Sequence, residues 1–226
     1  MAWVLQTTPY LDTLILSKCH PMLDSFKESM PHWYDAALKT NRDCLEGGIP
    51  EALRGADAVI AASRPGPDII KGEWIRLMAK KPIVFALANP VPEILPEVAI
   101  RYGAEVVATG RSDYPNQVNN SLGFPAVFRG VLTIRAKKIT DSMCIEGAKA
   151  LARYAERKGL RRDYIIPKMS EVGAYMEVAY SIAKEAIKEG LARRKLNDDE
   201  LISEIKYLIE RPKRMLNVLL GNSIIQ

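Results

Sequence analysis

Carboxamide side chains are the residues of this sequence whose positions suggest chemistry. Asn89 follows directly on the apolar run IVFALA, where packing gives no reason for an amide. An amide can donate a hydrogen bond to a carboxylate and accept one from a hydroxyl, which suits Asn89 to binding a ligand. The alternative is a local turn in which the Asn89 side chain bonds the backbone before Pro90, and spacing alone favours that turn.

A second group of polar side chains lies between residues 112 and 120, in the stretch SDYPNQVNN. Five carboxamide or carboxylate side chains among these nine residues are too polar for a core segment. The small and turn-forming residues SLGFP follow, and they would let the backbone approach a ligand or another helix closely. The stretch is either a binding loop that leads into a buried helix or an exposed loop whose side chains satisfy the backbone, and physical chemistry weights the two equally.

Charged and titratable side chains give weaker signals. Arg64, Arg111 and Arg129 could each hold a carboxylate or phosphate with two hydrogen bonds, although a surface or structural salt bridge is the commoner role of a single arginine. His20 and His32 lie beside prolines without metal-ligand spacing, so we assign neither a catalytic role.

The cysteines and the start of the chain bear on its location. Cys19, Cys44 and Cys144 are an odd number without CxxC spacing, which disfavours a disulfide framework or a zinc cluster. The first residues lack the pattern of a secretory signal, and no apolar run approaches the roughly 20 residues that a membrane span needs. These features predict a cytoplasmic protein with no membrane partner.

The composition is typical of a globular protein. Of the 226 residues 48% are hydrophobic and 26% are charged, which excludes disordered, collagen-like and coiled-coil classes. The net charge is +5, but the 32 basic and 27 acidic residues are interspersed, and the aromatic residues are scattered. The densest basic cluster, Arg193 to Lys195, is expected to close a helix. Nucleic acid is therefore not an expected partner.

Strands and helices are predicted to alternate in the first half of the chain. Continuous apolar strands separated by helices indicate a parallel sheet that is covered on both faces. Short apolar runs predict strands at 13–16, 58–62, 82–87 and 105–109, and helix-like stretches lie at 50–54, 70–79 and 92–102.

The apolar spacing becomes helical after Pro125. We interpret the apolar stripes there as packing surface, and Asn197 with the acidic residues after it is typical of a helix start. We expect an α/β domain over residues 1–137 and a helical carboxy-terminal region over residues 138–226 that packs on it. The predicted helices are 126–137, 145–158, 170–191 and 198–210.

Polar turns follow three of the predicted strands. They are 63–66 (SRPG), 88–90 (ANP) and 110–113 (GRSD). Ligands of an open parallel sheet bind outside the carboxyl ends of its strands, where loops gather beside helix amino termini. We therefore expect these three turns to meet at one binding edge.

Three motifs, in this order, resemble those of the malic enzymes, in particular the smaller prokaryotic type. They are PIVFALANP at 82–90, ATGRSD at 108–113 and NQVNNSLGFP at 116–125. Three ordered motifs are far more specific than a single glycine-rich motif. The resemblance extends from about Leu14 to the end of the chain.

The resemblance implies oxidative decarboxylation of malate to pyruvate and carbon dioxide, with reduction of NAD or NADP and assistance from Mg²⁺ or Mn²⁺. It implies that Asn89 and Asn119 or Asn120 bind malate, because carboxamides hold a dianionic substrate without adding charge that opposes the metal. It also implies that the cofactor lies along a turn and contacts the Asn89 loop; the turn consists of Ser63, Arg64, Pro65 and Gly66.

The chain also departs from the family pattern. The tyrosine, the lysine and the acidic metal ligands of malic enzymes come from regions upstream of the resemblance, so we assign no catalytic residue and no metal ligand here. The first Rossmann strand and its glycine-rich turn should precede Leu14, yet the first thirteen residues contain no glycine. We therefore expect a Rossmann-like parallel sheet that lacks its first strand and binds its cofactor weakly. Ser17 and Lys18 stand where NAD-dependent enzymes usually carry an acid, which weakly favours NADP.

Two functions fit these observations. The first is the carboxy-terminal part of a malic enzyme, inactive alone, with malate and pyruvate as its small-molecule partners. Its protein partner would be a separate amino-terminal malic enzyme domain or further copies in a homo-oligomer. The alternative is a non-catalytic binding or assembly module derived from the malic enzyme fold.

Overall fold

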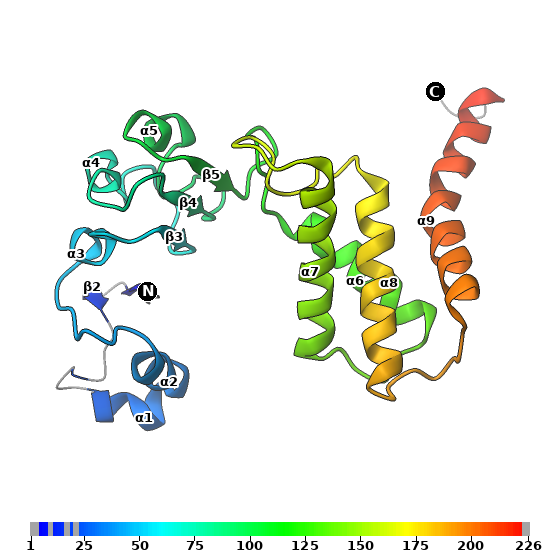
Figure 1. Cartoon of the computed structure of the whole chain (residues 1–226), viewed down its shortest axis with the longest axis horizontal. Helices are drawn as coiled ribbons and strands as arrows, with labels where there is room; N and C mark the ends of the chain where they lie inside the picture. Colours follow the sequence, from blue (N-terminus) through cyan, green and yellow to red (C-terminus); the bar gives the residue numbers. More distant parts are fainter. Residues whose placement is uncertain (1–4, 9–10, 16–18, 20–22, 223–226) are drawn as a thin grey trace. The chain divides into compact units, whose positions relative to one another are not determined.

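The computed structural model describes residues 5–8, 11–15, 19 and 23–222 of the chain. Contacts divide the chain into two compact units, Met1–Gln117 and Val118–Gln226, each described by itself below (Figure 1). The boundary between the two units, after Gln117, lies earlier in the sequence than the domain boundary that we predict at residue 137. The reason is that the helix just before residue 137 packs mainly on a helix of the second unit. No helix among the described residues is long and apolar enough to cross a membrane.

The first unit contains a parallel sheet of three strands in the order β3-β4-β5. The strands are β3 (Ala58–Ala61), β4 (Ile83–Ala86) and β5 (Val106–Thr109), and Val59, Val84 and Val107 lie opposite one another in the register. This confirms three of the predicted strands and the parallel α/β class. Short β-branched runs bounded by turns identified them correctly.

Three short helices complete this part of the first unit: α3 (Ile49–Leu53), α4 (Gly72–Ile75) and α5 (Pro96–Arg101). The side chains of Val59, Val84 and Val107 pack into one core with residues of these helices, such as Ile75 and Ala99. Helices α4 and α5 are shorter than the sequence predicts. Pro96 stands at the start of α5, where a missing N–H costs nothing, so the residues before it remain outside the helix.

The predicted strand at 13–16 does not belong to this sheet, and that expectation is wrong. Strand β2 (Leu11–Ile15) pairs with β1 (Leu5–Thr8) in a separate antiparallel sheet. Only two residues separate the two strands in the sequence, and a parallel pairing needs a connection of a dozen or more. Leu16, the last residue of the predicted strand, lies outside the described residues.

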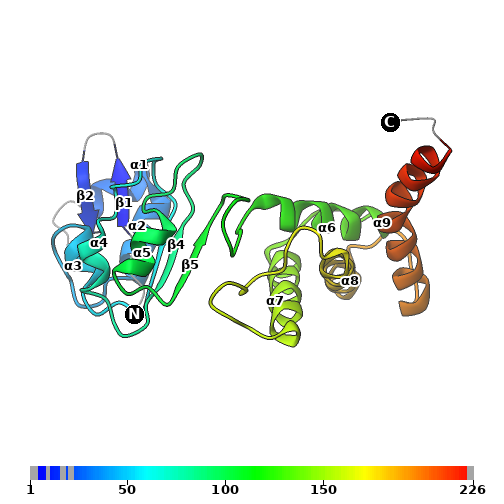
Figure 2. The ribbon, with the colours of Figure 1, turned by 90° about the horizontal axis from the view of Figure 1, so that it is seen from above.

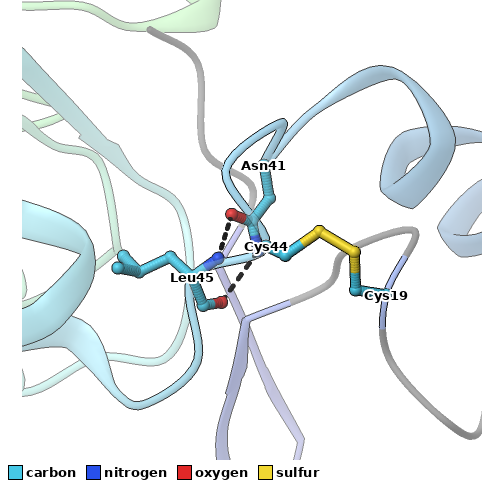
Figure 3. Close-up of a disulfide and its surroundings, with 4 residues drawn as sticks. All are labelled: Cys19, Asn41, Cys44 and Leu45. Carbon is cyan, nitrogen blue, oxygen red and sulfur yellow. Dashed lines mark hydrogen bonds between the residues drawn. A yellow bond between two sulfur atoms is a disulfide. The ribbon is translucent and has the colours of Figure 1, made fainter.

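Between β2 and α3 the chain forms η1 (Leu23–Ser25), α1 (Phe26–Ser29) and α2 (Pro31–Lys39), which we did not predict. Cys19 and Cys44 form a disulfide with Cα atoms 5.6 Å apart (Figure 3). Cys144 is free and exposed. The odd number without CxxC spacing disfavours a disulfide framework, and the structure nevertheless pairs two of the three cysteines. An odd count argues against a framework of several bridges, but it does not exclude one.

The loop that carries Cys44 is held by a buried amide. Asn41 is 1% exposed; its Nδ2 donates to the Leu45 carbonyl at 2.9 Å, and its Oδ1 accepts from the Leu45 N–H at 2.8 Å (Figure 3). Asn41 and Cys44 both have positive φ angles, a conformation that asparagine tolerates better than most residues. The side chain of Asn41 thus closes the turn that presents Cys44.

The second unit is helical, as predicted. It contains α6 (Asn120–Thr133), α7 (Asp141–Lys158), α8 (Val172–Lys188) and α9 (Asp198–Gly221). Helix α8 packs on both α6 and α7, and Figure 2 looks along α8 with α6 crossing it. Ile182, Ala183 and Ala186 of α8 are fully buried in this core.

The largest differences between predicted and observed helix boundaries in this unit are at the start of α6 and the end of α9. Helix α6 begins six residues earlier than the predicted Ala126, because Asn119 caps it by accepting from the Ser121 N–H. Helix α9 extends beyond the predicted end at Glu210 and continues through Pro212 to Gly221. The capping box of Asn197 and Glu200 fixes its start as predicted.

Candidate functional site

Three polar loops leave the carboxyl ends of β3, β4 and β5 in the first unit. Because the strands are parallel and adjacent, these loops begin at the same edge of the sheet. They contain the predicted turns 63–66, 88–90 and 110–113. The predicted convergence of the three turns at one sheet edge is therefore confirmed.

The loops after β3 and β4 are joined by their backbones. The Gly66 N–H donates to the Val91 carbonyl at 3.3 Å, the Ile70 N–H donates to the Glu93 carbonyl at 3.0 Å, and Asp68 and Ile94 form an antiparallel bridge. Gly66 has a φ of 151°, which side chains other than hydrogen rarely permit. The two loops thus form one interlocked structure.

A carboxyl group fastens the bases of these same two loops. Glu93 is completely buried; its Oε1 accepts from the Ser63 N–H at 2.7 Å and from the Ser63 Oγ at 3.1 Å, and its Oε2 accepts from the Ala88 N–H at 3.0 Å. We did not single out this residue from the sequence. The available signal was a lone acid within the apolar and proline-rich segment VPEILP, directly after ALANP.

Arg111 connects the third loop to the second. Its Nη1 donates to the Pro90 carbonyl at 3.2 Å, and its Nε and Nη2 donate to the Asp113 carboxylate at 2.8 and 2.6 Å. These hydrogen bonds raise the pKa of Arg111 and lower that of Asp113. The guanidinium also lies over the Tyr114 ring, 5.5 Å from its centre. Of the two roles considered for Arg111, the surface or structural salt bridge is the one observed, and its two side chains are exposed.

In the polar stretch at 112–120, some side chains bond the backbone and others remain available for a ligand, so each of the two interpretations that we left open holds for part of it. Asn116 is buried and donates through Nδ2 to the Val107 carbonyl at 3.0 Å, so it supports the backbone at a positive φ of 55°. Asn119 caps α6. Asn120 is exposed, and its side chain makes no hydrogen bond within the described part of the chain. The Asn120 amide therefore remains open to a ligand.

Asn89 has the same open character in the first unit. It is exposed at the end of the β4 loop and precedes a cis peptide bond to Pro90. Within the described residues its side chain makes no hydrogen bond, so the local turn that we considered is not formed. Ser63, Arg64 and Pro65 are also exposed on the neighbouring loop. The structure thus brings the predicted cofactor turn and Asn89 to the same sheet edge.

The first turn of α6 is braced from within the second unit. The Tyr175 hydroxyl donates to the Ser121 carbonyl at 3.2 Å, and the Ser121 hydroxyl lies 3.2 Å from the Met169 sulfur. Burial raises the pKa of Tyr175, which keeps its hydroxyl a donor. Asn119 and Asn120 belong to this unit and Asn89 to the other, so a pocket shared by all three remains a prediction.

The acidic, histidine and cysteine side chains decide whether the site could hold a metal ion by itself. The described residues include no group of three or more histidine, cysteine, aspartate or glutamate side chains that could hold a metal ion. The residues at the loop edge therefore do not fit a divalent metal by themselves. Their chemistry is that of hydrogen-bond donors and acceptors for a polar ligand.

The sequence matches the family model described as "Malic enzyme, NAD binding domain" over residues 50–187. An NAD-dependent malic enzyme of Geobacillus stearothermophilus is 44% identical over 164 residues, which are 73% of this chain and 34% of that enzyme. An NADP-dependent malic enzyme of Rhizobium meliloti is 38% identical over 215 residues, 83% of this chain and 28% of that enzyme.

A solved structure shows the same similarity. The crystal structure of the malic enzyme of Entamoeba histolytica aligns with a TM-score of 0.86 and 40% identity, covering 93% of this chain and 43% of that one. The chain spans about a third of the length of the two curated relatives. The matched region contains the loops after β3, β4 and β5 and the start of α6.

Proposed function

Because the chain belongs to the malic enzyme family, we propose that it supplies the nicotinamide- and malate-binding part of an enzyme that oxidatively decarboxylates malate to pyruvate and carbon dioxide. Catalytic and metal-binding groups would come from the upstream part of a malic enzyme. That part would also hold the Mg²⁺ or Mn²⁺, which supplies Lewis-acid chemistry when bound. Malate and pyruvate are the small-molecule partners of this proposal.

The observation that carries the proposal is the state of Asn89. Its amide is exposed and has no hydrogen bond within the described residues, while the backbone on both sides of it is fixed. The Ala88 N–H is bonded to Glu93, and the Pro90 carbonyl is bonded to Arg111. A polar group that is held in place without a partner is suited to a ligand. Asn119 or Asn120 would add a second amide to the malate carboxylate and hydroxyl.

NAD or NADP is the proposed cofactor, lying along the turn from Ser63 to Gly66 and reaching Asn89. The fit rests on polar groups that the structure leaves accessible on this turn, in particular the side chain of Arg64. Guanidinium groups bind phosphate oxygens well, so Arg64 is suited to an anionic part of the cofactor. Ser17 and Lys18, the positions that favour NADP, lie outside the described residues.

We further propose a cytoplasmic protein that works as a homo-oligomer or with a separate amino-terminal malic enzyme domain. The runner-up is a binding or assembly module without catalysis. No other described strand pairs with the outer edge of β3, which supports association of either kind, since unpaired strand edges invite further strands.

Calorimetric titration of the whole chain with NADP, NAD and malate tests the proposal. We expect binding of a cofactor and of malate, with malate affinity about tenfold lower in Asn89→Ala because one charge-assisted hydrogen bond is lost. Asn217→Ala, an exposed asparagine of α9, is the matched control and should bind like the parent. Binding of neither ligand would favour the assembly module, and steady turnover of malate by this chain alone with Mn²⁺ would contradict the need for an upstream part.

A further inference from the structure

We infer that Glu93 is a positioning residue that couples the cofactor turn to the malate-binding loop. This inference rests on the proposed function, because it concerns how the two halves of that site are held. Glu93 touches neither ligand in our proposal. It acts on Ser63, the first residue of the cofactor turn, and on Ala88, the residue before Asn89.

The two carboxyl oxygens of Glu93 are divided between the two loops. Oε1 serves the loop after β3, where it accepts from both the N–H and the hydroxyl of Ser63. Oε2 serves the loop after β4, where it accepts from the Ala88 N–H. A planar group with fixed oxygen positions therefore relates the backbone of Ser63 directly to that of Ala88.

Burial makes this link stiff. Glu93 has no exposed surface, and the hydrogen bond that it accepts from the Ala88 N–H is buried as well. A buried donor that loses its acceptor has no water to replace it, so the Ala88 N–H depends on the carboxyl group, whereas the two bonds from Ser63 are only part-buried. The backbone of Glu93 is also fixed, since its carbonyl accepts from the Ile70 N–H at 3.0 Å.

Other contacts between the loops cannot substitute for this one. The Gly66–Val91 and Ile70–Glu93 backbone bonds and the Asp68–Ile94 bridge lie further along the loops, away from the strand ends. At the strand ends the Leu87 N–H also donates to the Ala61 carbonyl at 2.8 Å, but among the hydrogen bonds of the described residues only those of the Glu93 side chain join Ser63 to Ala88. A shift of Asn89 on binding malate would therefore reach the cofactor turn through Ala88, Glu93 and Ser63 in succession.

Coupling between the malate-binding loop and the cofactor turn can be measured as a change in ligand affinity. Malate should change the affinity of the chain for NADP, and by linkage NADP should change the affinity for malate by the same factor. We expect a factor of about five or more in the parent chain. In Glu93→Gln the side-chain amide keeps one acceptor oxygen, but its NH₂ group faces a hydrogen-bond donor, either that of Ser63 or that of Ala88. The link between the two loops is then broken, so the factor by which malate changes the NADP affinity should fall to about one.

The experiment is a set of calorimetric titrations of the whole chain with NADP, in the absence and presence of saturating malate. Glu93→Gln is compared with Glu97→Gln, an exposed glutamate in the first turn of α5 that should retain the parent factor. Circular dichroism checks that each variant is folded. If Glu93→Gln does not fold, Ser63→Ala removes only the hydroxyl bond to Oε1 and should reduce the factor in part.

The outcomes separate the two hypotheses. An unchanged coupling factor in Glu93→Gln, even with weaker binding of each ligand, overturns the inference and leaves the proposed function standing, because Glu93 would then be only a structural residue. A parent chain that binds both ligands independently also overturns the inference alone. A parent chain that binds neither ligand overturns the proposed function, and the inference with it.

Discussion

The surroundings of an asparagine decide what its amide does, and three asparagines of this chain show the range. Asn116 is buried, and its amide donates a hydrogen bond to the Val107 carbonyl. Asn119 is half-buried and caps α6. Asn89 is exposed and without a hydrogen bond in the described structure, which leaves both its donor and its acceptor for a ligand. Residue type alone does not separate these roles, because all three amides have the same groups.

Tyr164 yields a prediction about pH at the scale of one residue. Its side chain is buried and its hydroxyl donates to the Glu171 carboxylate at 3.0 Å; burial and then this hydrogen bond raise its pKa to about 12. The unfolded chain loses this proton near its ordinary pKa of 10.0. Stability is therefore fully present below about pH 10 and falls as the pH rises toward 12, by at most about 1.4 kcal/mol per pH unit.

Urea unfolding of the parent and of Tyr164→Phe checks this prediction. The difference in unfolding free energy between the two proteins should shrink by about 1 kcal/mol between about pH 9 and pH 11, because only the parent carries the shifted phenol. Lysines that titrate in the same range affect both proteins equally and cancel in the difference. Equal pH slopes for the two proteins would show that Tyr164 does not retain its proton in the folded state.

The candidate site was predictable from the sequence in its exposed residues but not in its support. Asn89 and the turn at 63–66 stand directly after apolar strands, so strand position alone indicated where they would lie. Glu93 was not predictable in this way, because a charged residue is expected at the surface until its partners are known. One partner, Ala88, lies five positions away in the same loop, but the other, Ser63, lies thirty positions away on another loop, which no local pattern contains.

At the scale of elements, the crossing of α6 and α8 depends on a glycine. A Cβ added at Gly130 would overlap the backbone carbonyl oxygen of Ala179 and approach the Ile182 Cβ at 3.2 Å. The backbone of a buried helix cannot give way without separating the helices. Gly123, on the same helix, has nothing within 4 Å of the corresponding position. The two glycines thus form a matched pair.

We expect Gly130→Ala to lower the unfolding free energy by about 1–3 kcal/mol, the usual cost of overpacking. Gly123→Ala should instead raise it by about 0.5–1 kcal/mol, because alanine loses less conformational freedom than glycine in a helix. Denaturant midpoints of both variants measure these effects. A Gly130→Ala variant as stable as the parent would mean that α6 and α8 are not packed as closely as described.

The elements were largely predictable because their signals are local. Apolar runs identified β3, β4 and β5, and the helical spacing identified α6 to α9. The pairing of Leu11–Ile15 was not predictable from the sequence. The same β-prone run suits a parallel sheet or an antiparallel hairpin, and only the partner strand decides between the two. The start of α6 was missed because a polar cap precedes a first turn with no strong apolar spacing.

In the sheet of the first unit, no described strand pairs with the outer edge of β3. The bonds from Ile83 N–H to the Asp57 carbonyl and from Leu87 N–H to the Ala61 carbonyl direct these alternate residues toward β4. The backbone groups of Ala58 and Ile60 therefore point to the other edge, where the described residues provide no partner strand. The Ile60 side chain is 73% exposed on the face opposite the valine core. An all-parallel sheet is ordinarily covered on both faces, so this edge and face are where a further strand and helix would fit.

We therefore predict that a separately produced malic enzyme segment carrying the first strand and its glycine-rich turn will pair with β3. Amide exchange should then slow at Ala58 and Ile60 by tenfold or more, while Val59 and Ala61, on the β4 side of the ladder, stay as they were. Ile60→Lys should weaken the association, because it would bury an unpaired charge, whereas Ile100→Lys, at an isoleucine that is 59% exposed on α5, should not. Protection of Ile60 that depends only on the concentration of this chain would point instead to pairing between two copies, and equal exchange at Ile60 with and without the segment would exclude strand addition at this edge.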